Sequence, residues 1–139
     1  MKMRYVTKTM TVVINSMCVA MTGGTKATAT NLRPGQSLGF IDRIHANSVF
    51  GQSIYPDIYH QAAAYMYYII KNHSFHDGNK RTGLATAVSF LQWNGINFRP
   101  FPEDPAFDFV VEIAGGEAGP DEAIPRIAKW FKKLSERED

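Results

Sequence analysis

Ten consecutive residues near the middle of the chain carry a high density of unlike polar groups. The segment from His73 to Thr82 reads His-Ser-Phe-His-Asp-Gly-Asn-Lys-Arg-Thr. Backbone N–H groups at the start of a helix favour an anion, and the helix dipole adds to that preference. Because Gly78 permits close approach of the backbone, and Lys80 and Arg81 add positive charge, the pattern predicts a phosphate site at a helix start. The chain contains no P-loop pattern of the form Gly-x-x-x-x-Gly-Lys-Ser/Thr.

Other residues of this segment suit chemistry on the phosphate. Asp77 supplies a hard oxygen ligand, and magnesium bound to phosphate takes only one or two protein carboxylates. His73 lies a few residues upstream, and histidine exchanges a proton near neutral pH, so it suits a general base toward a hydroxyl. Phe75 is expected to anchor the loop in the core, and Thr82 to cap the helix that follows. Together the residues indicate attack of a hydroxyl on a nucleotide phosphate.

Two helices are predicted to hold the segment between them. Apolar residues recur at intervals of three and four after Pro56-Asp57, which predicts a helix that ends near Asn72. A second helix is predicted from about Asn79 to Gln92, where Asn94-Gly95 stops it. The inward faces are expected to consist of Ile58, Ala62, Tyr65, Met66 and Ile69 in the first helix, and Leu84, Ala87, Val88 and Leu91 in the second.

Four more helices are predicted, and no run of alternating strands is visible, so the expected fold class is all-α. They span about Thr7 to Gly23, Ser37 to His45, Ala106 to Ala114, and Asp121 onward, with a long loop over 22–37. In the last of them Pro125 is expected in the first turn. The β-branched run over 11–14 leaves a strand as the alternative for the first helix. That helix is expected to bury an apolar stripe made of Met10, Val13, Ile14, Met17, Cys18 and Met21.

Length and composition limit the possible classes of protein. The 139 residues fit a single domain over 1–139, and 45% of them are hydrophobic. One cysteine excludes an intramolecular disulfide framework, and a net charge of +2 gives no support to electrostatic binding of nucleic acid. The apolar stretch over 10–21 follows basic residues, as in a secretory signal, but it is too short to span a bilayer. A cytoplasmic protein with no membrane partner is expected.

The segment resembles the signature of the Fic/Doc superfamily, in particular its Doc (death-on-curing) branch. The broader Fic pattern is His-Pro-Phe-x-x-Gly-Asn-Gly-Arg. This chain has Ser74 in place of the proline and Lys80 in place of the second glycine, and lysine at that place is the mark of Doc. The N-terminal third is less typical of the family. Weaker likeness extends over Phe50-Gly51, Tyr55-Pro56, the Ala-Ala-Ala-Tyr run at 62–65, and Leu91-x-x-Asn94-Gly95.

This resemblance implies a compact Fic/Doc-like helical bundle and a transferase that uses ATP and Mg²⁺. Fic enzymes transfer AMP to a target hydroxyl, whereas Doc transfers the γ-phosphate to a threonine of elongation factor Tu and so blocks translation. The resemblance assigns His73 as the general base and Asp77 as the magnesium ligand. It assigns the phosphate contacts to Gly78, Asn79, Lys80 and Arg81.

A partner is implied in the same way. Doc-like toxins are neutralised by a small antitoxin of the Phd type, whereas many Fic proteins carry an inhibitory helix of the form Ser/Thr-x-x-x-Glu-Gly/Asn. The run Ser135-Glu136-Arg137-Glu138-Asp139 comes near that form but ends in the wrong residue. A separate Phd-like antitoxin is therefore expected.

Other functions remain open at this point. The same segment fits a Fic-type AMP transferase, and a catalytically inactive binding protein would also keep the fold. His76-Asp77 also matches the dipeptide of an HD-type metal phosphohydrolase, with His45 or His60 and Asp104 or Asp108 as further ligands. For His45, His60 and His76, surface or packing roles are favoured over ligation. For Arg33, a solvated loop charge is favoured over a nucleotide contact.

Overall fold

The computed structural model describes residues 3–49 and 53–135. Within these ranges the chain forms six α-helices and no β-strand beyond isolated bridges, so the all-α prediction is confirmed. None of these helices is both long and apolar enough to cross a membrane. Phe50-Gly51 and Glu136–Asp139, which entered the sequence analysis, lie outside the described residues. The helices are α1 (Lys8–Met21), α2 (Gly39–Val49), α3 (Ile58–Asn72), α4 (Asn79–Trp93), α5 (Glu103–Gly115) and α6 (Pro120–Leu134).

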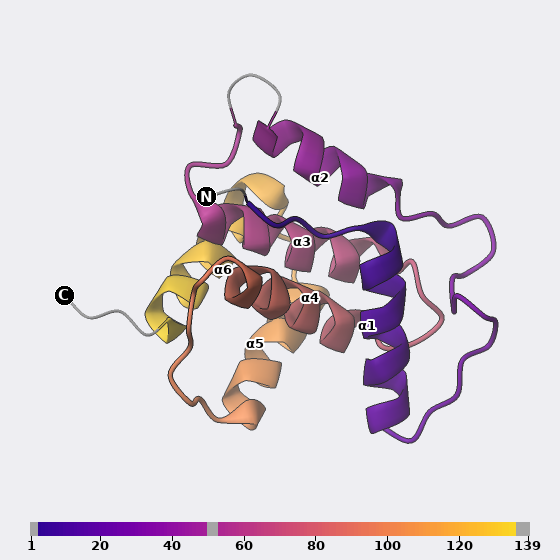
Figure 1. The fold of residues 1–139 in the computed structure, drawn as a ribbon. Helices are drawn as coiled ribbons and strands as arrows, with labels where there is room; N and C mark the ends of the chain where they lie inside the picture. Colours follow the sequence, from indigo (N-terminus) through magenta and orange to yellow (C-terminus); the bar gives the residue numbers. More distant parts are fainter. Residues whose placement is uncertain (1–2, 50–52, 136–139) are drawn as a thin grey trace.

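Helices α3 and α4 form the centre of the fold and run side by side (Figure 1). α3 begins where Asp57 caps it, since the Asp57 carboxylate accepts a hydrogen bond of 2.9 Å from the His60 backbone N–H. The two helices pack closely at Gly83, where a Cβ atom would lie 2.8 Å from Ile70 Cγ1. α1 passes across the ends of α3 and α4 where the His73–Gly78 loop joins them (Figure 1).

The core lies around α3, whose predicted stripe is buried except for the half-buried Ile58. α3 buries more than one face because α2, α4, α5 and α6 all pack against it. On α4, Ala87 and Leu91 are buried as predicted, whereas Leu84 and Val88 are only half-buried. Leu84 and Val88 pack against the edge of the core and also line a cavity between α1, α4 and α5, which explains their partial exposure.

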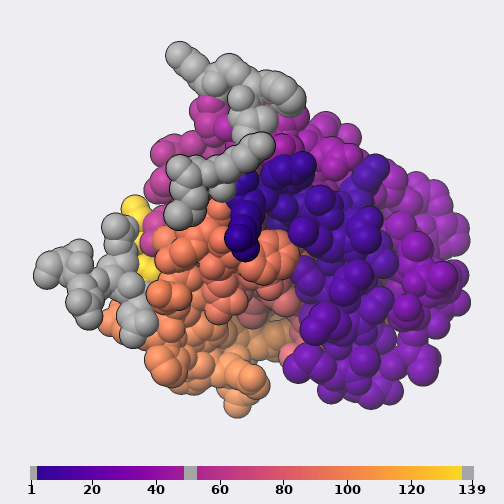
Figure 2. Space-filling view, in the orientation of Figure 1, coloured from indigo at the N-terminus to yellow at the C-terminus, as the bar shows by residue number. Residues whose placement is uncertain are grey.

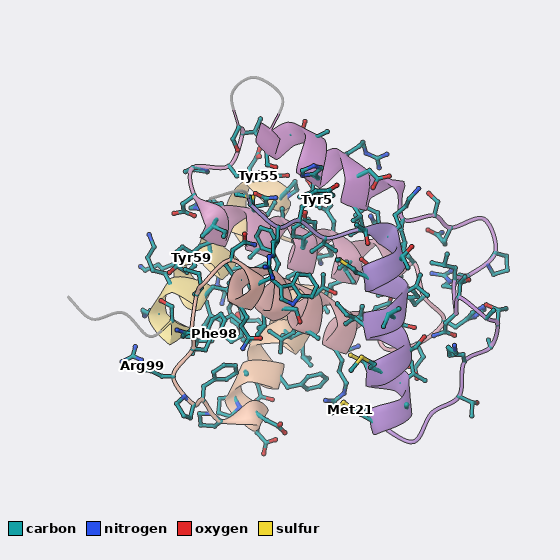
Figure 3. All side chains as sticks on the ribbon, viewed as in Figure 1. Tyr5, Met21, Tyr55, Tyr59, Phe98 and Arg99 are labelled. Atoms are coloured by element: carbon teal, nitrogen blue, oxygen red, sulfur yellow. The ribbon has the colours of Figure 1, made fainter. Side chains whose placement is uncertain are left out.

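α1 is a helix, as predicted, but it buries the opposite face from the one expected. Its fully buried residues include Thr11 and Asn15, both polar. The strand alternative over 11–14 is wrong, and of the apolar stripe expected to be buried only Ile14 and Cys18 are even half-buried. The cause is the neighbouring loop over 73–78, where the Asp77 carbonyl accepts a hydrogen bond from the side chain of Asn15. The exposed apolar side chains are Met10, Val13, Met17 and Met21, and Met21, at the end of α1 in Figure 3, is 84% exposed.

Helix boundaries differ from prediction at three places. α2 continues to Val49, four residues past the expected end, and α5 begins at Glu103, three residues early. Pro105 does not prevent this early start because it lies in the first turn, where no intrahelical N–H bond is needed. α6 starts at Pro120, so Pro125 lies inside the helix and not in its first turn. Because proline has no backbone N–H, the carbonyl four residues before Pro125 has no hydrogen-bond donor within the helix. Pro125 is exposed, so water can bond to this carbonyl instead.

Candidate active site

The loop from His73 to Gly78 reverses the chain between α3 and α4, and a left-handed residue stands at each end. His73 is the C-cap of α3 with φ 46° and ψ 45°, and Gly78 is the N-cap of α4 with φ 79°. Glycine adopts this conformation freely, whereas for another residue it costs about 1–2 kcal/mol. A histidine therefore occupies a position that favours glycine or asparagine. Its side chain is exposed and can be reached from solvent.

Asn79 holds the loop closed by bonding both backbone groups of Phe75. Its Oδ1 accepts from the Phe75 N–H at 3.0 Å, and its Nδ2 donates to the Phe75 carbonyl at 2.9 Å. The Phe75 ring is 1% exposed and packs in the core. Both polar atoms of the Asn79 side chain are thus used within the loop. The backbone N–H of Asn79 is therefore the group of this residue that is best placed to bind an anion.

The start of α4 is open to an anion. The N-cap is Gly78, and within the described chain no side chain caps this end of α4. The Thr82 N–H makes a bond of 2.8 Å to the Gly78 carbonyl, and the N–H groups of 79–81 precede it. Thr82 was expected to cap the helix; it lies instead in the first turn, where its hydroxyl is buried.

Charged side chains surround this helix start. The Asp77 carboxylate accepts from the Gly78 N–H at 2.8 Å, so it lies beside the open N–H groups. Lys80 is half-buried in the first turn, and Arg81 is exposed. Open donors, two cations and a hard carboxylate fit a nucleotide phosphate with a magnesium ion. The structure thus brings Asp77, Gly78, Asn79, Lys80 and Arg81 together at one helix start, with His73 at the other end of the loop.

Two fully buried asparagines fix the loop from the N-terminal side. Asn15 Nδ2 donates to the Asp77 carbonyl at 2.9 Å and to the Thr82 hydroxyl at 3.0 Å. Asn15 Oδ1 accepts from Asn31 Nδ2 at 3.0 Å. Asn31, with φ 59°, accepts at Oδ1 from the Ala27 N–H at 3.1 Å. Sequence reasoning did not find these residues, although an amide interrupting the apolar stretch of α1 was a signal for Asn15.

The segment that follows α1 pairs with the loop through its backbone. An antiparallel bridge joins Leu32 to Phe75, with bonds from the Arg33 N–H to the Ser74 carbonyl and from the His76 N–H to the Asn31 carbonyl. Arg33 was expected to be a solvated loop charge, and its side chain is exposed. Its Nη1 also donates to the His73 carbonyl at 3.0 Å. Arg33, which lies outside the loop over 73–78, thus holds the backbone of His73, the candidate general base.

Cys18 lies close to the helix start but does not suit a nucleophile. Burial raises the pKa of its thiol, and the hydrogen bond with Thr82 and the charge of Arg81 only partly oppose this effect. The thiol is therefore protonated at neutral pH, and a protonated thiol is a poor nucleophile. Arg81 also extends toward α5, where its guanidinium lies 4.6 Å from the centre of the Phe107 ring.

The residues considered as further metal ligands of a phosphohydrolase lie on different helices and make other contacts. His60 Nδ1 pairs with Asp57 Oδ1 at 2.8 Å beside the start of α3, and His45 stacks on Tyr5 with ring centres 3.5 Å apart. Asp104 and Asp108 lie on the separate helix α5. Over residues 3–49 and 53–135, no three His, Cys, Asp or Glu side chains gather in a metal-binding arrangement. The structural roles favoured for His45 and His60 agree with these contacts.

Changing Asn15 to alanine should lower both stability and activity. The Asp77 carbonyl and the Thr82 hydroxyl would lose their Asn15 partner in a buried place, which costs about 2–3 kcal/mol of unfolding free energy. Chemical denaturation measures this change, and Met17→Ala on the exposed face of α1 is the matched control, with a change within about 0.5 kcal/mol. Equal stability of the two variants would show that the buried amide does not hold the loop.

Comparison with known proteins gives the following matches. The sequence model of the Fic/DOC family matches residues 5–91. The chain is 35% identical over 82 residues to "Toxin Doc" of Mycolicibacterium smegmatis, and the match covers 58% of this chain and 63% of that protein. It is 30% identical over 101 residues to "Protein kinase doc" of Escherichia phage P1, covering 73% of this chain and 74% of that protein.

Proposed function

This chain belongs to the Fic/DOC family, and from that premise we propose that it is a Doc-like toxin that transfers the γ-phosphate of ATP to a protein hydroxyl. The observation that carries the proposal is the start of α4. An uncapped helix end with Lys80 in its first turn lies beside the Asp77 carboxylate, and His73 stands at the far end of the same short loop. The names of the two relatives, a toxin and a protein kinase, support the same reading.

The chemistry follows from these positions. The phosphates of ATP bind the N–H groups at the start of α4, with Lys80 and Arg81 balancing their charge. Asp77 would hold a magnesium ion, which would supply positive charge to offset that of the phosphates. His73 takes the proton of the acceptor hydroxyl as its oxygen bonds to the γ-phosphorus. The bond from that phosphorus to the bridging oxygen breaks, and ADP leaves.

Transfer of AMP remains the second candidate because it would use the same fold and loop. Lys80 distinguishes the two: it stands where Fic enzymes have glycine, and its half-buried side chain takes up space and adds charge beside the phosphates. We favour phosphate transfer for this reason. By the resemblance to Doc, the acceptor is a threonine of elongation factor Tu, and the consequence is a block of translation in the cytoplasm.

A Phd-like antitoxin is the proposed partner. The "Toxin Doc" relative gives one reason for this proposal. The exposed methionines and valine on α1 give another, since exposed apolar side chains clustered on one face are typical of surfaces that another protein covers. Growth arrest on expression, relieved by a small protein encoded beside this chain, would support the toxin–antitoxin pairing. Unimpaired growth at high expression would contradict it.

ATP labelled separately at the α- and γ-positions tests the proposed reaction. The purified protein is incubated with Mg²⁺ and a cell lysate, and we expect label from the γ-position on one abundant protein and none from the α-position. Removing the metal with a chelator should abolish the transfer, because charge on the phosphates is then not neutralised. Label from the α-position instead would mean that the protein transfers AMP and that Lys80 does not select the reaction.

A further inference from the structure

A cavity of about 300 Å³ lies between α2 and α3, two helices that run in opposite directions (Figure 1). It extends from Ile54, in the segment before α3, to Asn72, the last residue of α3. His73 follows Asn72 directly and is the C-cap of α3. Because consecutive Cα atoms are only about 3.8 Å apart, one end of the cavity lies beside the candidate general base.

The lining of this cavity combines apolar surface with hydrogen-bond donors. Phe40 and Ile44 of α2 are buried, and the centre of the Phe40 ring lies 6.5 Å from that of Tyr68. The polar side chains are those of Arg43, Asn47, Tyr55, Tyr68 and Asn72. Over the described residues, Arg43 is the one charged side chain in the lining, and no carboxylate is present there. The cavity therefore favours an anionic group.

Arg43 and Tyr55 both keep their protons at physiological pH. A guanidinium is not deprotonated in proteins, and burial raises the pKa of the Tyr55 hydroxyl to about 12, with a smaller effect from the nearby Tyr68. Arg43 is exposed on α2, and within residues 3–49 and 53–135 no carboxylate lies at ion-pair distance from it. Both groups can therefore donate hydrogen bonds to a carboxylate that enters from outside.

The proposed reaction brings two substrates to the loop over 73–78. In it the phosphates lie at the start of α4, beside a hollow between α1 and the start of α5 that is visible in Figure 2 and has Arg81 in its wall. None of the residues that line this hollow lines the cavity between α2 and α3. The cavity is thus separate from the phosphate site and adjoins the other end of the loop, where the acceptor hydroxyl must meet His73.

Size and exposure favour a protein segment as the occupant of this cavity. A volume of about 300 Å³ is at the lower limit of small-molecule sites. Ile54 is 65% exposed, and an exposed apolar side chain beside a cavity is a surface that a protein partner can cover. The positive charge of Arg43 suits an aspartate or glutamate of that partner. A segment that carries both an acidic and an apolar side chain fits these features.

We propose that the cavity between α2 and α3 docks the acceptor protein, with an aspartate or glutamate side chain of that protein against Arg43 and an apolar side chain against Ile54. This assignment rests on the proposed function, because it requires His73 to take the proton of the acceptor hydroxyl. An extended chain advances about 3.3 Å per residue, so the acidic residue stands a few residues from that hydroxyl along the acceptor chain. Arg43 thus selects the acceptor by charge and takes no part in the chemical step.

Steady-state kinetics test the assignment, with the lysate protein that takes the γ-label purified and used as the acceptor. We expect Arg43→Ala to raise the KM for the acceptor about tenfold, because a charge-assisted hydrogen bond is lost. Asn47→Trp, which narrows the cavity from α2, should also raise this KM. The kcat and the KM for ATP should keep their wild-type values in both variants. Arg43→Lys retains the charge and should recover most of the loss.

Arg99→Ala is the matched control. Arg99 is an exposed arginine in the connection between α4 and α5 and does not line the cavity. This variant should keep the wild-type KM for the acceptor. An acceptor KM that stays unchanged in both Arg43→Ala and Asn47→Trp, or a fall in kcat without a change in KM, overturns the docking assignment.

An exchange of charges tests the chemistry of the partner. In the acceptor, the acidic residue nearest the labelled hydroxyl is replaced with lysine, which should raise the KM measured with the wild-type protein. Arg43→Glu should reverse the preference and phosphorylate the lysine-bearing acceptor better than the unaltered one. If Arg43→Glu keeps the wild-type preference, the acidic residue does not bind at Arg43 and the assignment is wrong.

Failure of the proposed function would look different. If the wild-type protein transfers no γ-label to any lysate protein, the proposed function is wrong, and the docking assignment falls with it. If label is transferred and His73→Asn abolishes the transfer, while the Arg43 variants behave like the wild type, the reaction stands and the acceptor docks elsewhere.

Discussion

Replacing Gly83 with valine is expected to lower the free energy of unfolding by about 3 kcal/mol or more, a large part of the roughly 5–15 kcal/mol that stabilises an ordinary domain. A Cβ atom at this position would lie 2.8 Å from Ile70 Cγ1 and 3.0 Å from the Met66 carbonyl oxygen. Ile70 is fully buried, and the carbonyl belongs to the backbone of α3, so neither neighbour can move aside easily. α3 and α4 would have to separate, and the core between them would open.

Urea denaturation followed by circular dichroism measures this loss. Gly115→Val is the matched control, because Gly115 also lies in a helix but a Cβ atom there meets nothing within 4 Å. The control should stay within about 1 kcal/mol of the wild type. Equal losses in the two variants would mean that close packing of α3 on α4 is not what Gly83 provides.

Substituting His73 should reduce the rate of transfer by about 10²- to 10⁴-fold, the usual contribution of a general base. Asparagine is the informative replacement. It adopts the left-handed conformation more readily than most residues, so it suits the φ of 46° at this position while removing the imidazole. The His73 carbonyl, which accepts from Arg33, is a backbone group and is kept. Folding and ATP affinity are therefore expected to change little.

Transfer of γ-label to protein at saturating ATP provides the measurement. His76→Ala is the control, since His76 is exposed in the same loop and its contact with the Asn31 carbonyl comes from the backbone. This variant should retain most of the activity. A His73→Asn protein that transfers phosphate at the wild-type rate would remove His73 from the mechanism and leave the general base unassigned.

The central helices could be predicted because the information that specifies them is local. Apolar residues at intervals of three and four place α3 at Ile58–Asn72, and the glycine before Asn79 marks the start of α4. The motif between them is also local, since its ten residues are consecutive. The clustering of Asp77 and Lys80 at one helix start follows from these boundaries alone.

The support of the loop could not be predicted because it depends on contacts between distant residues. Asn15 reaches the Asp77 carbonyl across a separation of 62 residues, and Arg33 reaches the His73 carbonyl across 40. Apolar periodicity predicted which face of α1 would be buried, and it was wrong because hydrogen bonds to the loop decide the orientation. Hydrophobic pattern carries no information about such polar partners. The left-handed backbone of His73 could not be predicted either, because this conformation usually occurs at glycine or asparagine.

The pairing of 31–33 with 74–76 also bears on the order of events in folding. α3 and α4 are joined by a short loop, and such local pairs form quickly. The bonds from Asn15, Asn31 and Arg33 close much longer stretches of chain, which is slower. We therefore expect a newly made chain to acquire its helical scaffold first and the final conformation of the His73–Gly78 loop last. A delay between synthesis and activity would then follow from the topology itself.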